Sequence, residues 1–189
     1  MHHWKPAAKY LESAVAALQR GQLVGMPTET VYGLAGNALD ARAVAEIFAA
    51  KGRPTFDPLI VHAAHSAAAL ALAEKVPDHA ARLAEAFWPG PLTLVLPRKS
   101  HLPELLSAGL DTVALRVPSH AIARELLSRC GFPLAAPSAN RFGQISPTRA
   151  EHVLEELAGQ SAVAGVLDAG PCQVGVESTV VAFPGGGRV

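Results

Sequence analysis

Hydrophobic positions recur along the chain with two periods, one typical of helices and one of strands. Leu11, Val15 and Leu18 lie on one helical face, which predicts a helix over 9–20 that Gly21 ends. Short apolar runs bounded by turn residues predict buried strands. By these criteria further helices begin at or just after 40, 66, 78, 119 and 148, and strands cover 22–26, 59–61, 93–96, 112–117, 134–136, 163–167 and 179–183.

Polar side chains that suit helix starts support three of these elements. Asp40 and Ser119 directly precede helical patterns, so their oxygens can accept a free N–H of the first turn. Thr148 opens the Thr-Arg-Ala-Glu run of a capping box, which also marks a helix start. At the N-terminus, His2 and His3 belong to no pattern, and we expect them to be disordered.

Helical and extended segments alternate from one end of the chain to the other. This order predicts an α/β domain whose sheet is sandwiched between helices. The 189 residues fit one domain, and no linker, repeat or low-complexity tract divides them, so we expect a single domain over 1–189. In such folds ligands bind where loops converge at strand ends.

The composition narrows the function classes. Hydrophobic residues make up 50% of the chain, which excludes an intrinsically disordered protein. The 16 basic and 16 acidic residues cancel, which argues against a general binder of the nucleic-acid backbone. The sequence shows no apolar run of about 18 residues and no secretory pattern, so we expect a cytoplasmic protein without a membrane span. Cys130 and Cys172 suit an intracellular chain with buried thiols, with one disulfide as the alternative.

Five polar loops interrupt this apolar background. The densest, 27–33, either places two threonines, a carboxylate and a phenol at a ligand, or bonds its threonines to the local backbone and buries Tyr32 in the core. Lys51 and Arg53 flank Gly52 after a helix end, where they either complement the helix dipole or meet an anionic ligand. The other three loops, each explained as well by an ordinary turn, are 137–140, 146–148 and 177–179.

Charged and imidazole side chains also occur within or beside predicted strands. Arg116 lies between Leu115 and Val117, so it faces either solvent or a site, and we favour the site. His62 and His65 are spaced as an HxxH pair, but they fall on different predicted elements, and we expect no shared metal ion. The sequence contains no P-loop, no GxGxxG after a strand and no GxSxG elbow.

Seven motifs in these loops and their flanks read PTETVYGL, KGRP, WPGPLT, LRVP, APSAN, SPT and GVESTVV, in this order. In order and spacing they resemble the YrdC-like family, the threonylcarbamoyl-AMP synthases, from about residue 10 to 183. The resemblance implies a three-layer fold in which a twisted, mixed sheet is flanked by helices and forms a concave active site. It also implies that L-threonine, bicarbonate or CO₂, and ATP give threonylcarbamoyl-AMP and pyrophosphate, and that partner proteins transfer the group to tRNA.

The resemblance implies roles for individual residues as well. Lys51 and Arg53 are expected to be catalytic, because they would neutralise the triphosphate and the departing pyrophosphate. ATP is expected to contact these two and also Asp57, Thr112, Ser138, Asn140 and Ser146. L-Threonine is expected to be held by Thr30, His62, Ser178 and Arg116, the last on its carboxylate. Mg²⁺ is expected to arrive with ATP, and no residue is assigned to a metal ion.

The chain departs from the family pattern at three places. Asp57 stands where many members have Asn, and a carboxylate cannot donate a hydrogen bond to phosphate. Phe142 replaces a small polar residue in the loop after PSAN. We also expect that a short C-terminal extension or further domain is missing, with Arg188 as a candidate for the arginine that covers the nucleotide.

Three alternatives to the synthase remain open. The YciO-like branch lacks intact KGRP and PSAN loops, both of which are present here, so we favour the synthase. An RNA-binding module is weakened by the zero net charge, which allows at most a weak RNA contact. A catalytically inactive scaffold is supported only by Asp57 and the short C-terminus.

Overall fold

The computed structural model describes residues 1–5 and 7–183. Its helices are α1 (Ala8–Gln19), α2 (Ala41–Lys51), α3 (Ser66–Leu70), α4 (Asp78–Phe87), the 3₁₀ helix η1 (Glu104–Ser107), α5 (Ala121–Cys130) and α6 (Ala150–Glu156). Its strands are β1 (His2–Trp4), β2 (Leu23–Met26), β3 (Gly33–Asn37), β4 (Ile60–His62), β5 (Leu92–Pro97), β6 (Thr112–Arg116), β7 (Leu134–Ala135), β8 (Val163–Leu167) and β9 (Thr179–Ala182).

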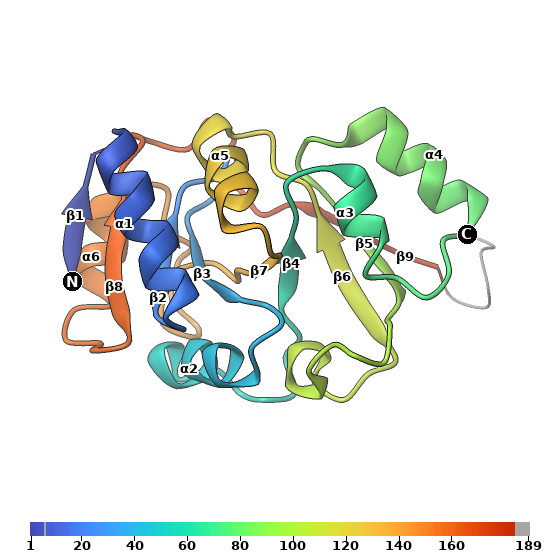
Figure 1. Cartoon of the computed structure of the whole chain (residues 1–189), viewed down its shortest axis with the longest axis horizontal. Coiled ribbons are helices and arrows are strands. Elements are labelled where there is room, and N and C mark those ends of the chain that lie inside the picture. Colours follow the sequence, from blue (N-terminus) through green and yellow to red (C-terminus); the bar gives the residue numbers. More distant parts are fainter. Residues whose placement is uncertain (6, 184–189) are drawn as a thin grey trace.

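The described strands form one mixed sheet in the order β1-β8-β2-β3-β7-β4-β6-β5-β9. Parallel pairs join β1 to β8, β8 to β2, β4 to β6 and β5 to β9, and the remaining neighbours are antiparallel. Strands distant in sequence therefore lie side by side, such as β3 and β7 at the centre of the sheet (Figure 1). The expected α/β fold with a mixed sheet and flanking helices is confirmed.

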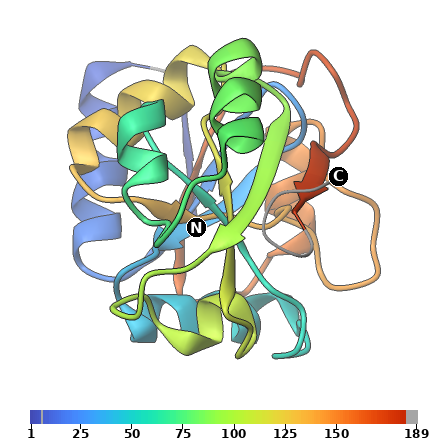
Figure 2. The same cartoon turned by 90° about the vertical axis from the view of Figure 1, so that its right-hand side faces the viewer.

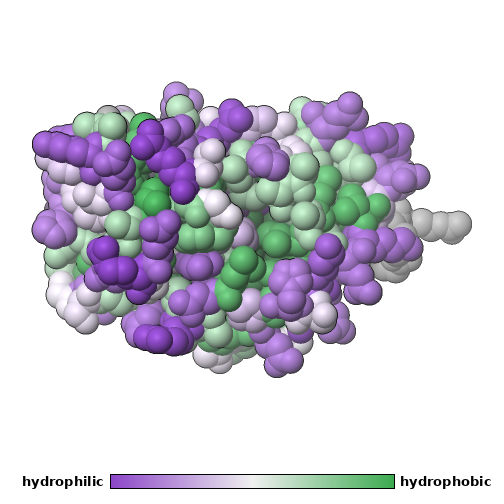
Figure 3. Space-filling model, in the orientation of Figure 1, coloured by the Kyte–Doolittle hydropathy of each residue, from purple (hydrophilic) through white to green (hydrophobic). Residues whose placement is uncertain are grey.

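Helices cover the two halves of the sheet differently. At the β1 end, α1 packs on β8, β2 and β3 and against α5. Helix α2 contacts β3 and β2, and helix α6 contacts β8. At the β9 end, α3 and α4 pack on β6 and β5. In Figure 2, β9 and the orange loops lie on the side away from α1, α3, α4 and α5. The face of the molecule that α1 presents is largely hydrophilic, with scattered apolar positions, as expected of solvated helices (Figure 3).

The alternation of side chains in the β9 half separates the core from an open face. Val61, Leu94 and Leu115 are fully buried in the main hydrophobic cluster with α3 and α4. Because successive side chains in a strand point to opposite faces, the residues next to them point away from this cluster. Ile60 and Ala114, which are partners in register, lie on that opposite face. Among the described helices, α3 and α4 thus pack on the core side of β5 and β6, and none covers the opposite face of β4, β6, β5 and β9.

The helix starts confirm one predicted cap and correct two. Asp40 caps α2, accepting a hydrogen bond from the Arg42 backbone N–H at 2.9 Å. Ser119 is not a cap, because α5 begins one residue later and its N-cap residue, His120, makes no capping side-chain bond. The capping box at Thr148 is also wrong. The N-cap residue of α6 is Arg149, one position later, and no side chain caps this helix.

The N-terminal residues are a strand, which corrects the expectation that His2 and His3 are disordered. β1 extends the sheet beside β8, and Trp4 is buried. Asp168, at the end of β8, accepts hydrogen bonds from His3 Nε2 at 2.9 Å and from Lys5 Nζ at 2.7 Å. These contacts come from residues more than 160 positions apart, so the local pattern could not reveal them.

Strand β3 was not predicted, because its sequence Gly-Leu-Ala-Gly-Asn has weak strand propensity. Packing explains one of its glycines, since a Cβ at Gly36 would lie 2.9 Å from Leu23 and 3.2 Å from Ile47. Both cysteines are free thiols, which excludes the alternative of a disulfide. None of the described helices has the length and apolarity needed to cross a bilayer.

Acid titration should release β1 through Asp168. Burial alone would raise the pKa of Asp168, but hydrogen bonds from Lys5, Gly170 and His3 outweigh it and lower the pKa to about 2. The resulting stabilisation, about 1–2 kcal/mol, is present above the unfolded pKa near 4 and is lost as the pH falls toward 2. When the pH falls from about 4 to about 2, the free energy of unfolding should therefore decrease less in Asp168→Asn than in the wild type. Urea unfolding at the two pH values measures this difference. An equal loss in both proteins would contradict the assignment.

Candidate active site

A cavity of about 340 Å³ opens on the uncovered face of the sheet. Its apolar floor comes from strand residues of β4, β5, β6 and β9, namely Ile60, Val95, Ala114 and Val180. Its polar lining comes mainly from loops and consists of Arg53, Asp57, Thr93, Ser138, Glu177 and Ser178. Four of these were predicted as site residues: Arg53, Asp57, Ser138 and Ser178.

The segment 27–32, between β2 and β3, holds the loops around this cavity. The backbone of Tyr32 donates to the Pro147 carbonyl and accepts from the Ala139 N–H, both at 2.8 Å. Its hydroxyl donates to the Gly170 carbonyl at 2.8 Å. Because a buried backbone group without a partner is costly, each bond fixes one loop against this segment. Two connections that are far apart in sequence, 136–149 between β7 and α6 and 168–178 between β8 and β9, therefore meet at one residue.

The interpretation of the 27–33 loop as local backbone bonding with Tyr32 in the core is confirmed for two of its residues, while the interpretation as a ligand site stays a prediction. Thr28 serves the local backbone, since its hydroxyl donates to the Val31 carbonyl at 2.6 Å, and Tyr32 is fully buried. Thr30 instead faces another element, because its hydroxyl accepts from Arg116 Nη1 at 2.9 Å. The carbonyls of Glu29 and Thr30 also accept from the N–H groups of 174 and 175, which ties the loop before β9 to the same segment.

Arg116 is buried in a polar cluster, which excludes the solvated-face alternative. Its side chain is 3% exposed, and Nη2 pairs with Glu29 Oε1 at 2.7 Å. Nε donates to the Gly90 carbonyl at 3.3 Å and Nη1 to Thr30. Three of its five N–H donors are thus used by the protein, and two remain for a ligand. The sequence showed the Glu29 carboxylate in this polar loop, but Glu29 was not among the predicted site residues.

His62 lies beside Arg116 in register across β4 and β6. Burial, and then the positive charge of Arg116, lower the pKa of His62 to about 3, so the imidazole is neutral at neutral pH. Ser178 joins the cluster from the other side, because its hydroxyl shares a 2.8 Å hydrogen bond with Thr93, the register partner of Arg116 on β5. The structure thus brings together all four residues predicted for threonine, and adds Thr93.

Lys51 contacts the 138–140 loop. Its ammonium donates to the backbone carbonyls of Ser138 and Asn140, and its own carbonyl accepts from the Phe142 N–H at 2.9 Å. Burial, and then the charge of Arg53, lower the pKa of Lys51 to about 8. The side chain therefore anchors a wall of the cavity and leaves one N–H for a ligand.

Arg53 reaches the cavity from the turn that Gly52 closes with φ +59°. Its guanidinium pairs with Asp57 Oδ2 at 2.9 Å and donates to the Asp57 and Pro58 carbonyls, both at 3.1 Å. The carboxylate that departs from the family pattern is thus an ion-pair partner of the predicted catalytic arginine. The two cations of this turn do not point at one place, because Lys51 is directed to the backbone of another loop.

The 140–148 loop is organised by its own polar side chains. Asn140 donates through Nδ2 to the Arg141 carbonyl at 2.9 Å and to the Gln144 carbonyl at 2.6 Å. Ser146 donates to Glu177 Oε1 at 2.7 Å, which joins this loop to the one before β9. Thr112, by contrast, is two residues beyond Ala114 on β6, outside the described lining of the cavity. The roles of Asn140, Ser146 and Thr112 as nucleotide ligands stay predictions.

The described residues contain no group of three or more His, Cys, Asp or Glu side chains placed to hold a metal ion. His65 is used locally, since its Nδ1 accepts from the Ala68 N–H at 3.2 Å at the start of α3. Phe142, which departs from the family pattern, is 48% exposed. Arg188 lies outside the described residues.

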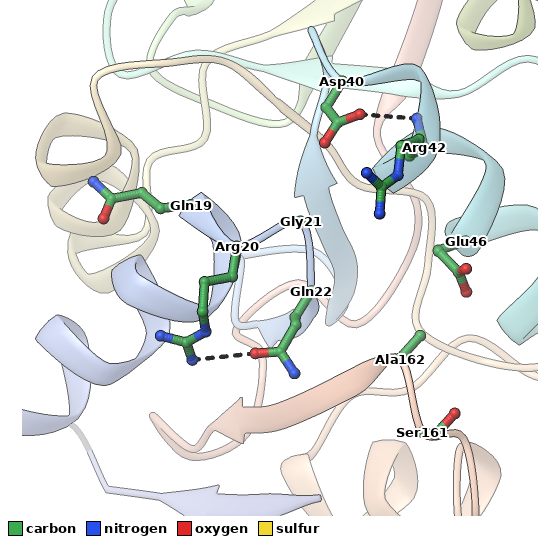
Figure 4. Close-up of a pocket in the computed structure, with 9 residues that line it drawn as sticks. All are labelled: Gln19, Arg20, Gly21, Gln22, Asp40, Arg42, Glu46, Ser161 and Ala162. Atoms are coloured by element: carbon green, nitrogen blue, oxygen red, sulfur yellow. Dashed lines mark hydrogen bonds between the residues drawn. The ribbon is translucent and has the colours of Figure 1, made fainter.

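A second groove, of about 470 Å³, lies at the opposite end of β2 and contains no predicted site residue (Figure 4). Its polar groups serve local structure: Arg20 donates to Gln22 at 3.1 Å, and Asp40 caps α2. This groove therefore brings together none of the residues to which the sequence assigned chemistry.

Comparison with known proteins finds relatives that cover most of the chain. The Sua5/YciO/YrdC family model, described as telomere recombination, matches residues 16–189. A threonylcarbamoyl-AMP synthase of Pyrococcus abyssi is 48% identical over 181 residues, which are 96% of this chain and 51% of that protein. The crystal structure of P. abyssi Sua5 complexed with L-threonine superimposes with a TM-score of 0.92 at 46% identity, over 96% of this chain and 53% of the other.

The fold is shared more widely. Escherichia coli YciO superimposes with a TM-score of 0.83 at 23% identity, over 96% of this chain and 90% of the other, which shows a common fold. The chain spans about half the length of the curated synthases it matches first, 51% and 49%.

The hydroxyl of Tyr32 should contribute to stability through the loop it holds. It donates to Gly170 and accepts from the Ala169 N–H at 3.2 Å, so Tyr32→Phe removes the partner of two partly buried backbone groups. We expect a loss of about 1–3 kcal/mol in the free energy of unfolding, measured with urea. Tyr10→Phe, at a half-buried tyrosine on α1, is the matched control and should change stability by less than about 0.5 kcal/mol. An equal change in the free energy of unfolding in both variants would show that the hydrogen bonds of the Tyr32 hydroxyl do not stabilise the protein.

Proposed function

The chain belongs to the Sua5/YciO/YrdC family, and from this premise we propose that it makes threonylcarbamoyl-AMP from L-threonine, bicarbonate or CO₂, and ATP. One observation carries the proposal: a cavity with a cationic turn at one wall adjoins a buried Thr30–His62–Arg116–Ser178 cluster. The first part suits a polyphosphate and the second suits a small amino acid. L-Threonine bound to the P. abyssi protein, which is 46% identical, supports the second assignment.

The reaction needs positioning more than a protein nucleophile. The neutral amine of threonine attacks CO₂ and forms a carbamate, and a carbamate oxygen then attacks the α-phosphorus of ATP as pyrophosphate leaves. Each attacking group belongs to a substrate, so the protein must hold the substrates in line and stabilise the developing charge. The geometry of the cavity matches this demand.

Arg53 is proposed to neutralise the triphosphate and the leaving pyrophosphate. Its guanidinium lines the cavity, and ATP would compete with Asp57 for it. Lys51 is proposed to act with it, through its remaining N–H and by fixing the loop of Ser138 and Asn140. We assign Ser138, Asn140, Ser146, Asp57 and Thr112 to the nucleotide as well, in line with the family motifs.

Arg116 is proposed to bind the carboxylate of threonine with its two unused N–H donors. Glu29 fixes the guanidinium plane, so the arginine is oriented before the substrate arrives. Selection of threonine over valine needs a buried hydrogen bond to the substrate hydroxyl, because a methyl group alone discriminates weakly. Thr30, His62 and Ser178 are the candidates for that bond.

Mg²⁺ is proposed to enter with ATP, held mainly by the phosphates. Asp57 and Glu177 are the carboxylates that line the cavity. Asp57 is already paired with Arg53, and Glu177 already accepts a hydrogen bond from Ser146. We further propose that residues 1–189 act as one YrdC-like domain, and that partner proteins transfer the threonylcarbamoyl group to tRNA. Because that reaction uses ATP and tRNA, we place it in the cytoplasm.

Release of pyrophosphate from ATP tests the function directly. We expect release only when L-threonine and bicarbonate are both present, with serine and valine much less effective than threonine. The measurement is pyrophosphate formed per protein, with each substrate omitted in turn. Absence of release in the complete mixture would contradict the proposal for this chain, and steep salt-sensitive RNA binding in the same preparation would favour the RNA-binding alternative.

Arg53→Ala should reduce pyrophosphate release at least about a hundredfold, as expected when a group that stabilises developing charge is removed. The melting temperature should change by only a few degrees, because the side chain bonds only its own turn. Arg124→Ala, at an exposed position of α5, is the matched control and should retain full activity. Full activity of Arg53→Ala would remove this residue from the mechanism.

A further inference from the structure

Four buried side-chain atoms in the described part of the chain have no hydrogen-bond partner, and two of them belong to the cluster around Arg116. One is Oε2 of Glu29, whose other oxygen pairs with Arg116. The other is Nδ1 of His62, the register partner of Arg116. Both side chains are more than nine-tenths buried, at 4% and 3% exposed. Unpartnered buried acceptors are costly, so such atoms suggest that a ligand supplies the missing donor.

The charges of the cluster point to the kind of donor. Arg116 and Glu29 together carry no net charge, yet each has unused bonding capacity: two N–H donors on the guanidinium and one oxygen on the carboxylate. Neutral His62 adds no positive charge beside them, because its pKa is lowered to about 3. A zwitterion, which carries one carboxylate and one ammonium, is the complement of this arrangement.

The cluster is contiguous with the cavity. Thr93 lines the cavity and is the register partner of Arg116 across β5 and β6. Ser178 also lines it and bonds to Thr93. The Glu29 carbonyl accepts from the Val174 N–H at 2.8 Å, so the loop that carries Ser178 is attached to the residue that carries the free oxygen.

We infer that Glu29 is a specificity-determining residue of this site, and that its free carboxylate oxygen accepts the α-ammonium of the amino-acid substrate while Arg116 holds the carboxylate. The inference rests on the proposed function and adds to it a requirement for a zwitterionic α-amino acid. Recognition of both charges would also position the nitrogen, which must first lose a proton and then attacks CO₂ as the neutral amine.

Binding of three ligands at pH 7 tests the inference without ATP. The probes are L-threonine, the dihydroxy acid that has a hydroxyl in place of its ammonium, and L-threoninamide, which lacks the carboxylate. Calorimetry on the wild-type chain should show L-threonine bound at least about tenfold more tightly than either analogue, since each analogue loses one charge-assisted bond. This first measurement does not depend on any variant being folded.

The decisive variant is Glu29→Gln, because the amide oxygen can still accept from Arg116, whereas the free oxygen is replaced by an uncharged NH₂ group that donates and cannot accept from an ammonium. L-Threonine should bind about 10–100-fold more weakly to it, whereas the dihydroxy acid should bind within about threefold of wild type. Glu85→Gln, on the exposed side of α4, is the matched control and should change neither. If the role of Glu29 were purely structural, Glu29→Gln would weaken the binding of both ligands equally.

The outcomes separate the two proposals. Selective loss of L-threonine binding in Glu29→Gln supports the inference. Three results overturn the inference while the proposed function stands. Glu29→Gln could weaken the binding of both ligands equally, or weaken the binding of neither. Alternatively, the wild-type chain could bind the dihydroxy acid with the same affinity as L-threonine. A wild-type chain that binds no L-threonine overturns the proposed function and this inference with it.

Discussion

Backbone hydrogen bonds from one buried segment, 27–32, hold the candidate site together. The segment accepts or donates bonds to loops around residues 139, 147, 170 and 174, none of which is near it in sequence. Buried peptide groups must find partners, so the loops have little freedom to move apart while the segment stays in place. The position of this segment explains why it can do so, because it connects β2 and β3, which are neighbours in the interior of the strand order.

The ion pair between Arg116 and Glu29 is the energetic centre of the same region. Burying two charges is expensive, and removing one partner of such a pair typically costs about 3–5 kcal/mol. Here the pair is supported by further bonds to Thr30 and Gly90, which satisfy the guanidinium in a defined orientation. A cluster that is neutral as a whole but incompletely bonded can remain buried in the empty protein and still recognise a charged ligand.

The two cations of the KGRP motif have different roles. Lys51 is directed to carbonyls of the 138–140 loop and is buried, whereas Arg53 remains at the cavity beside Asp57. A lysine ammonium can satisfy two carbonyls from one point, while the arginine fork suits carboxylate or phosphate. The motif therefore couples the construction of the cavity wall to the placement of charge within it.

The sequence by itself determined the order of most helices and strands, the cap at Asp40, and the family with its candidate residues. These features depend on local periodicity or on motifs that can be read in order. Only the tertiary structure decided that β1 and β3 are strands, that Thr148 bonds to another loop instead of capping α6, and that Thr93 and Glu29 join the candidate site. Each of these depends on a partner far away in sequence, because sheet register and buried polar bonds are made between segments, and no local pattern encodes which segments meet.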